Sequence, residues 1–312
     1  MKDGFSKLTK SEKIDWVIEN FFNSSNDDLK ILKQYWSEDE ELQKIHDEFS
    51  ENTLTNFFIP LGIAPNFLID NKNYTIPMAI EESSVVAAAC KSAKFWSKRG
   101  GFKTEIINVI KTGQVHFKFN GDKNKLYEFF ENSKSKILND CNEISENMLA
   151  RGGGILNINL IDKTSEISDY YQLSSDFNTV DSMGANFINS CLEQFAKSFE
   201  TEFLESKLFD EDENLEIVMS ILSNYVPQCL VKAEVRCKLN ELKNGDVEEP
   251  IKFARKFIDA IEIAKNDISR AVTHNKGIMN GIDAVVIATG NDFRSVEALS
   301  LIHISEPTRR YF

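Results

Sequence analysis

The chain has 312 residues, which suggests about two domains, and its 42% hydrophobic and 27% charged residues are typical of a folded globular protein rather than a disordered one. The 49 acidic and 36 basic side chains give a formal net charge of −13, which argues against a general nucleic-acid binder because phosphate contacts need a basic surface. The sequence shows neither the roughly 18 uninterrupted apolar residues of a membrane span nor the apolar region of a signal peptide, so we expect no membrane association.

The cysteines and histidines show no pattern of a disulfide framework or a metal site. The five cysteines are odd in number and have no Cys-x-x-Cys spacing, and the four histidines lack metal-ligand spacing. Free thiols in a reducing compartment are the better interpretation. We therefore expect a cytoplasmic protein that holds no metal.

The first eighty residues predict short helices followed by an irregular stretch. Thr9 and Glu12 have the spacing of a capping box, and apolar residues recur at helical spacing after them. Residues 57–68 are apolar but interrupted by two prolines and a glycine, which predicts a buried irregular segment. Residues 70–73 predict a turn between short strands.

A further helix is predicted where Glu81 and Glu82 precede a run of small and apolar residues. Acidic side chains in the first turn of a helix are favoured by the helix dipole. Gly100 and Gly101 predict the end of this segment.

From about residue 113 the pattern predicts one folding unit, in which strands and helices follow in the order β-α-β-β-α-β. The predicted ranges are 114–119, 125–149, 155–161, 170–177, 183–204 and 215–222. In this split βαβ plan two helices cover one face of an antiparallel sheet, so the predicted fold class is α+β. A long helix over residues 251–271 would return to the first apolar core, which makes the βαββαβ unit an insertion in a larger helical domain.

Two polar segments are candidate binding sites. Asp181 to Asn186 opens the second helix of the unit, and a helix N-terminus where Gly184 allows close backbone approach can bind a pyrophosphate. The alternative is N-capping by Asp181, with Gly184 needed for tight packing. From Arg270 to Asp292 many hydrogen-bonding side chains bracket an apolar run, which favours a lined pocket over a surface loop because polar groups near a core must be paired.

The second of these segments resembles the signature of the hydroxymethylglutaryl-CoA reductases, specifically their class II (degradative-type) branch. The resemblance rests on Thr273-His-Asn-Lys-Gly-Ile-Met-Asn-Gly-Ile-Asp and on Ala288-Thr-Gly-Asn-Asp. Supporting matches run in the family's order up to about Ala298: Glu51-Asn52, Pro60-Leu-Gly-Ile-Ala-Pro-Asn-Phe, Pro77-Met-Ala-Ile-Glu-Glu-Ser-Ser, Gly100-Gly-Phe, Arg151-Gly-Gly-Gly, Asp181-Ser-Met-Gly-Ala-Asn and Ile221-Leu-Ser-Asn. Several long motifs in the right order are far more specific than any one of them.

The resemblance implies an NAD(P)-dependent oxidoreductase of mevalonate metabolism that interconverts 3-hydroxy-3-methylglutaryl-CoA and mevalonate plus CoA. It implies a helical CoA-thioester-binding large domain, residues 1–108 and 218–298, with an inserted ferredoxin-like small domain, residues 109–217, for the dinucleotide. Because family members build the site between subunits, it also implies a homo-oligomer, at least a dimer.

The resemblance also implies roles for particular residues. Glu82 would protonate the carbonyl oxygen, Lys276 would stabilise the oxyanion, and Asp292 would hold the Lys–Glu network together. A proton donor needs a raised pKa, whereas a helix N-terminus lowers the pKa of a carboxyl group. Burial and the charge of Asp292 would therefore have to raise the pKa of Glu82. The alternative for Glu82 is plain dipole compensation. The other implied contacts are substrate-binding Ser84, Arg270, Asn224 and Asn280, and cofactor-binding Asp181, Met183, Gly184 and Asn186.

The class implies NADH as cofactor, with NADPH as the alternative. An acidic group on the ribose hydroxyl would favour NAD, and the resemblance brings Ser145, flanked by Glu143 and Glu146, near that position.

The end of the chain departs from the family. Residues 299–312 form an atypical tail, and His303 matches no family motif, so the catalytic histidine of the family's C-terminal segment is not assigned to it. We therefore expect a truncated reductase. The alternative is an inactive remnant that binds a CoA thioester or a dinucleotide without turnover.

Overall fold

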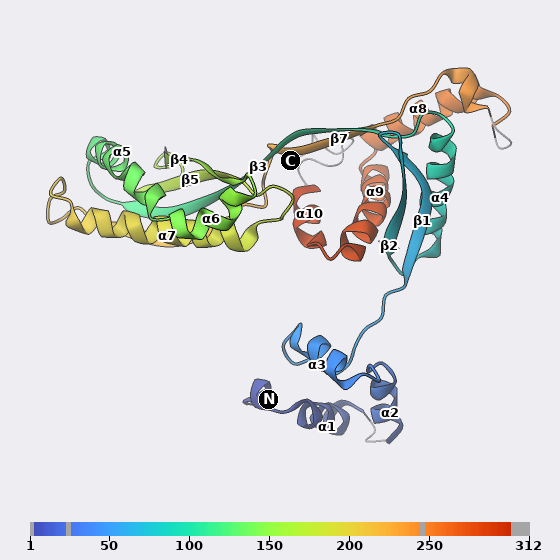
Figure 1. Ribbon diagram of the computed structural model, residues 1–312, viewed down its shortest axis with the longest axis horizontal. Helices are drawn as coiled ribbons and strands as arrows, with labels where there is room; N and C mark the ends of the chain where they lie inside the picture. Colours follow the sequence, from blue (N-terminus) through green and yellow to red (C-terminus); the bar gives the residue numbers. More distant parts are fainter. Residues whose placement is uncertain (1–2, 23–25, 244–246, 301–312) are drawn as a thin grey trace. The chain divides into compact units, whose positions relative to one another are not determined.

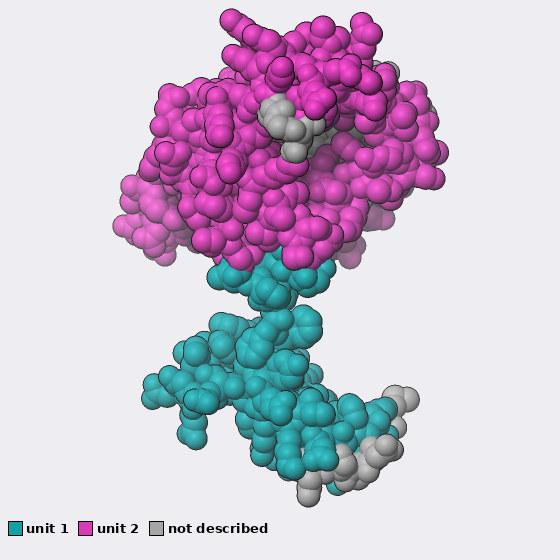
Figure 2. All heavy atoms as spheres, turned by 90° about the vertical axis from the view of Figure 1, so that its right-hand side faces the viewer, with its two compact units in different colours: residues 1–61, 79–81 teal, residues 62–78, 82–312 magenta. Residues whose placement is uncertain are grey.

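The computed structural model describes residues 3–22, 26–243 and 247–300, which form two compact units (Figure 2). The first unit consists of residues 1–61 and 79–81, and the second of residues 62–78 and 82–312. The division into a large and a small domain at the boundaries given above stays a prediction. Of the atypical tail, only Leu299 and Ser300 lie in the described part of the chain, at the end of the last helix.

The first unit is helical up to Glu48. A short 3-10 helix, Phe5–Lys7, is followed by α1 (Lys10–Phe21), α2 (Asn26–Gln34) and α3 (Glu40–Glu48). The predicted capping box is confirmed, because the Thr9 hydroxyl accepts a hydrogen bond from Glu12 N at 3.3 Å and the Glu12 carboxylate accepts one from Thr9 N at 2.7 Å.

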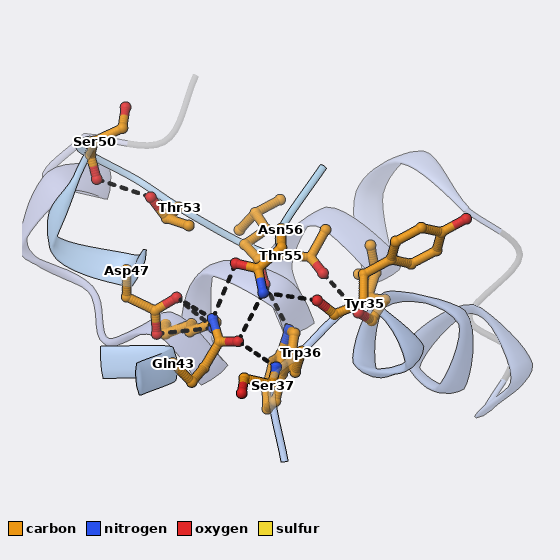
Figure 3. Close-up of polar contacts among 12 residues, drawn as sticks. Tyr35, Trp36, Ser37, Gln43, Asp47, Ser50, Thr53, Thr55 and Asn56 are labelled. Carbon is orange, nitrogen blue, oxygen red and sulfur yellow. Dashed lines mark hydrogen bonds and ion pairs between the residues drawn. The ribbon is translucent and has the colours of Figure 1, made fainter. Parts of the chain in front are cut away.

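A polar network around Gln43 holds the segment after α3 against the helices (Figure 3). The Gln43 side chain is only 7% exposed. Its Oε1 accepts hydrogen bonds from Ser37 N at 2.7 Å and from Asn56 Nδ2 at 2.9 Å, and its Nε2 donates to Asp47 Oδ1 at 2.8 Å. Thr55 Oγ1 donates to a backbone carbonyl of α2 at 2.7 Å. A buried amide with its partners in place fixes this segment in one position.

The prediction of a buried irregular segment at residues 57–68 is wrong. Most of it forms β1 (Leu61–Ile69), which pairs with β2 (Lys72–Ala79) in a two-stranded sheet, and Phe57 is 88% exposed. A proline within a strand is tolerated when no ladder partner needs its missing N–H, as in a sheet of only two strands. The predicted turn between them is confirmed, with Asp70 and Asn71 both at positive φ.

The second unit contains the predicted βαββαβ order (Figure 1). Its elements are β3 (Lys103–Phe119), α5 (Lys123–Asn139), α6 (Asn142–Ala150), β4 (Gly154–Asp162), β5 (Tyr170–Asn178), α7 (Ala185–Glu205) and β6 (Leu215–Leu222). The strands pair antiparallel in the order β4-β5-β3-β6, which confirms the split βαβ plan and the α+β fold class.

The core of this unit lies between the sheet and its helices. On β3, alternate residues such as Val115, Phe117 and Phe119 are fully buried, as the period of two in a strand requires. They pack with Phe195 and Phe199 of α7, among others. Each such side chain contributes roughly 1.5–3 kcal/mol on burial. The predicted helix over residues 125–149 is in fact two helices, α5 and α6.

Six further elements belong to the described part of the second unit. They are α4 (Ser83–Ser97), β7 (Cys229–Glu234), the 3-10 helix Leu239–Leu242, α8 (Pro250–Asn266), α9 (Ile268–Ala288) and α10 (Phe293–Ser300). Residues 103–109 of β3 pair with β7, so one long strand belongs to both parts of the unit.

The predicted single helix over residues 251–271 is wrong. It ends at Asn266, and Asp267 caps a new helix, α9, by accepting a hydrogen bond from Ser269 N at 3.0 Å. The polar segment from Arg270 therefore lies mostly on a helix rather than in a loop. Two glycines within α9 did not end it.

Candidate active site

Glu82 and Lys276 lie together although they are far apart in the sequence. Glu82 is the N-cap residue of α4 and Lys276 projects from α9, and Lys276 Nζ lies 3.4 Å from Glu82 Oε2. Ser84 Oγ donates a hydrogen bond to the other carboxylate oxygen of Glu82 at 2.6 Å. Three of the residues implied by the resemblance thus meet at the N-terminus of α4.

The surroundings of Glu82 favour its charged form. The Ser84 hydroxyl first, and then the charge and hydrogen bond of Lys276, lower the pKa of Glu82. The side chain is 46% exposed, so burial does not offset them. The rise in pKa that a proton donor needs is therefore absent in this arrangement.

Asp292 does not join this pair in the structure. Its carboxylate caps α10, with Oδ1 accepting a hydrogen bond from Arg294 N at 3.0 Å and Oδ2 accepting one from Ser295 Oγ at 3.2 Å. Burial alone would raise the pKa of Asp292, but the hydrogen bonds of Arg294 and Ser295 outweigh it and lower the pKa. Within the described ranges, no hydrogen bond or ion pair joins Asp292 to Lys276.

Ser295 connects Asp292 with a predicted substrate residue. Ser295 Oγ lies 3.3 Å from Asn224 Oδ1, in the loop after β6. Asn280 lies on α9 one turn after Lys276 and shares its face. Arg270 lies near the start of the same helix and is exposed.

The predicted cofactor segment is a tight loop at the N-terminus of α7. Gly184 is the N-cap residue at φ 77°, so the predicted alternative of capping by Asp181 is wrong. A Cβ at Gly184 would lie 2.6 Å from Thr179 Cβ and overlap the Thr179 methyl group, so glycine is needed both for its positive φ and for this close approach. Asp181, Met183 and Asn186 are exposed at the rim of this loop.

Lys111 is a polar residue of this region that the sequence analysis missed. It lies on β3, and its ammonium donates hydrogen bonds to Thr179 Oγ1 and to Ser182 O, each at 2.6 Å. Burial lowers the pKa of Lys111. The signal in the sequence is its register: Lys111 has the same parity as Val115 and Phe117, which point into the core.

A pocket of about 170 Å³ joins these parts of the site. Its lining includes Lys111 of β3 and Met183 of the cofactor segment, together with Asn224 after β6 and Ser295 of α10. One residue predicted to bind cofactor, Met183, and one predicted to bind substrate, Asn224, therefore line the same cavity of the second unit.

Ser145 lies in the core instead of at the surface. Its side chain is 4% exposed, because α6 turns Cys141, Ser145 and Met148 towards the interior, whereas Glu143 and Glu146 are exposed. Ser145 is thus not available to a ribose at the surface, which corrects its predicted position.

No group of three or more His, Cys, Asp and Glu residues that could hold a metal ion is found in the described part of the chain. The five cysteines are free thiols. None of the helices described in residues 3–22, 26–243 and 247–300 is both long and apolar enough to cross a membrane.

Comparisons with known proteins all lead to one family. The family model described as hydroxymethylglutaryl-coenzyme A reductase matches residues 10–307. The chain is 36% identical to 3-hydroxy-3-methylglutaryl-coenzyme A reductase of Archaeoglobus fulgidus over 95% of its length, and 30% identical to the probable enzyme of Borreliella burgdorferi over 99%. It spans 63% and 67% of the length of these two relatives.

A similar solved structure is the class II 3-hydroxy-3-methylglutaryl-CoA reductase from Streptococcus pneumoniae bound to NADPH in open conformations. The TM-score is 0.69 at 30% identity, and the match covers 95% of this chain and 76% of the other. A second structure of the enzyme from S. pneumoniae matches with a TM-score of 0.70 at 31% identity, with the same coverage.

Proposed function

This chain belongs to the hydroxymethylglutaryl-coenzyme A reductase family, and on that basis we propose that it interconverts 3-hydroxy-3-methylglutaryl-CoA and mevalonate plus CoA with a nicotinamide cofactor. The observation that carries the proposal is the contact between Glu82 and Lys276, whose charged atoms lie 3.4 Å apart across 194 residues of sequence. In the family signature these are the groups that act on the thioester carbonyl.

Lys276 would stabilise the negative charge that develops on the substrate oxygen. Hydride addition to a thioester carbonyl turns the oxygen into an oxyanion, and a preorganised donor at that oxygen is worth roughly 3–4 kcal/mol. The ion pair with Glu82 holds the ammonium near the N-terminus of α4 before substrate binds.

Glu82 would donate a proton to the same oxygen. Its lowered pKa in the chain alone does not suit a donor at neutral pH. Substrate binding would change this, because a bound thioester displaces water from the carboxyl and draws Lys276 towards the oxyanion. Both changes raise the pKa.

The nicotinamide cofactor supplies the hydride when bound. The N-terminus of α7 suits its phosphates, since no side chain described here caps it and its first N–H groups carry the positive end of the helix dipole. We propose NADH, as the class II resemblance implies. NADPH is the alternative to test, because the structure from S. pneumoniae is described with NADPH.

The remaining parts of the proposal follow the family. Asp292 would reach the Lys276–Glu82 pair on substrate binding, and Ser84, Arg270, Asn224 and Asn280 would contact the substrate. Residues 109–217 would form the dinucleotide domain and residues 1–108 with 218–298 the thioester domain. The active form would be at least a dimer, measurable by light scattering.

The test is a steady-state assay of nicotinamide absorbance with hydroxymethylglutaryl-CoA and either NADH or NADPH. Oxidation of the cofactor with formation of mevalonate supports the proposal. Tight binding of the CoA thioester without any turnover would instead identify a binding remnant. If the chain neither binds the CoA thioester nor turns it over, the proposed reaction is refuted.

A further inference from the structure

The loop between β5 and α7 is held in an unusual conformation. Val180 has φ 53° and Gly184 has φ 77°. Positive φ is rare for a β-branched residue and persists only where surrounding contacts determine it. Such outliers are found preferentially where a loop must present groups to a ligand.

Two groups of the loop and the ammonium of Lys111 on β3 close a triangle of hydrogen bonds. Lys111 Nζ donates to Thr179 Oγ1 and to Ser182 O at 2.6 Å, and Thr179 Oγ1 donates to Ser182 O at 2.7 Å. Thr179 is completely buried. The Ser182 hydroxyl adds a fourth bond, to Thr179 O at 2.8 Å.

This triangle determines which way the loop faces. Because the Ser182 carbonyl is bound on the inside by Lys111 and Thr179, the neighbouring side chains of Asp181 and Met183 remain exposed at the N-terminus of α7. Gly184 lies against Thr179 with no room for a side chain. Lys111 and Met183 also line the 170 Å³ pocket.

We propose that Lys111 is a positioning residue for dinucleotide binding: its ammonium holds the Thr179–Gly184 loop in the conformation that receives the cofactor. This inference rests on the proposed function of the loop. An ammonium suits this position because it donates to Thr179 Oγ1 and Ser182 O together, whereas an apolar side chain of similar length would leave both without this donor.

The test compares variants by direct titration of NADH and NADPH, followed through the fluorescence of the reduced nicotinamide. Lys111→Met keeps the length of the side chain but removes every donor, and Lys111→Arg keeps the charge and the donors. Lys118→Met is the matched control, since Lys118 lies on the same strand and is exposed. We expect Lys111→Met to weaken dinucleotide binding about tenfold or more, as for loss of hydrogen bonds from a charged group.

Other readouts separate positioning from a general loss of structure. We expect the KM for hydroxymethylglutaryl-CoA to stay within about twofold of wild type, Lys111→Arg to recover most of the affinity, and Lys118→Met to behave as wild type. If Lys111→Met proves unstable, Thr179→Val removes one corner of the triangle at nearly constant volume and should weaken the same binding.

The outcomes distinguish this inference from the proposed function. If wild type binds dinucleotide and neither Lys111→Met nor Thr179→Val weakens this binding, only the present inference is overturned. The same holds if the KM values for dinucleotide and for hydroxymethylglutaryl-CoA rise equally. If wild type binds dinucleotide without turnover, the proposed reaction fails while the titrations still decide the role of Lys111. If wild type binds neither NADH nor NADPH, both are overturned.

Discussion

Replacing Gly184 by alanine tests the close packing at the start of α7. The backbone at this residue has φ 77°, and the added Cβ would lie 2.6 Å from Thr179 Cβ and 3.1 Å from Thr179 Oγ1. Thr179 cannot easily turn away, because it is buried and its hydroxyl is hydrogen-bonded to Lys111 and Ser182.

The expected cost has two parts that a control variant separates. A left-handed backbone costs an L-residue about 1–2 kcal/mol, and overpacking adds about 1–3 kcal/mol, so Gly184→Ala should lose about 2–5 kcal/mol. Gly152→Ala is the control, since Gly152 has φ 85° with nothing within 4 Å of the added Cβ. Gly152→Ala should lose only the roughly 1–2 kcal/mol that the left-handed backbone costs any L-residue there.

The assay is urea unfolding of the full chain, followed by circular dichroism for wild type and both variants. The packing explanation predicts that Gly184→Ala loses about 1–3 kcal/mol more than Gly152→Ala. Equal losses for Gly184→Ala and Gly152→Ala would refute the packing explanation.

Three further predictions concern catalysis, the core and pH. Lys276→Ala should lower kcat at least about 10²–10³-fold without a measurable change in melting temperature, since the ion pair is exposed; a variant with most of its rate would exclude the oxyanion role. Phe117→Ala should destabilise the chain by about 3–5 kcal/mol in urea unfolding, because Phe117 is fully buried; a loss below about 1 kcal/mol would contradict this. Burial first, and then the nearby Glu297 carboxylate, raise the pKa of Asp283 from 3.8 to about 6. The folded state therefore binds this proton more tightly than the unfolded state. Protonated Asp283 adds at most about 3 kcal/mol to the free energy of unfolding, and this stabilisation is present below pH 3.8 and lost as the pH rises through 6. Asp283→Asn should accordingly raise the melting temperature at pH 8 relative to wild type but not at pH 4, and an equal shift at both values would show that Asp283 does not titrate in this range.

The sequence predicted the parts of the fold that follow a clear period. The apolar run of β6 and the helical spacing in α7 gave elements close to their observed bounds, because a helix stripe and a buried sheet face impose their period on the residues. The alternation over residues 114–119 identified the end of β3 but missed residues 103–113. The prediction failed at residues 57–68, where two prolines suggested an irregular segment although β1 tolerates Pro65. It also failed at Asp267, where one capping residue divides two helices.

The site was predicted only in part, because motifs identify residues but not their contacts. The pairing of Glu82 with Lys276 agrees with the resemblance. No motif specifies the neighbours of a residue. These neighbours lower the pKa of Glu82, give Asp292 its capping role and bury Ser145. Lys111 was missed because the predicted strand began only at residue 114, so its register with Val115 and Phe117 was not recognised.

The length of β3 has a mechanical consequence. Residues 103–109 pair with β7 and residues 110–119 with β5 and β6, so one unbroken strand runs through both ladders. Because the backbone of β3 is continuous, a movement of one ladder relative to the other would bend the strand where its partners change, next to Lys111. Such bending would reach Lys111, whose hydrogen bonds hold the turn before α7.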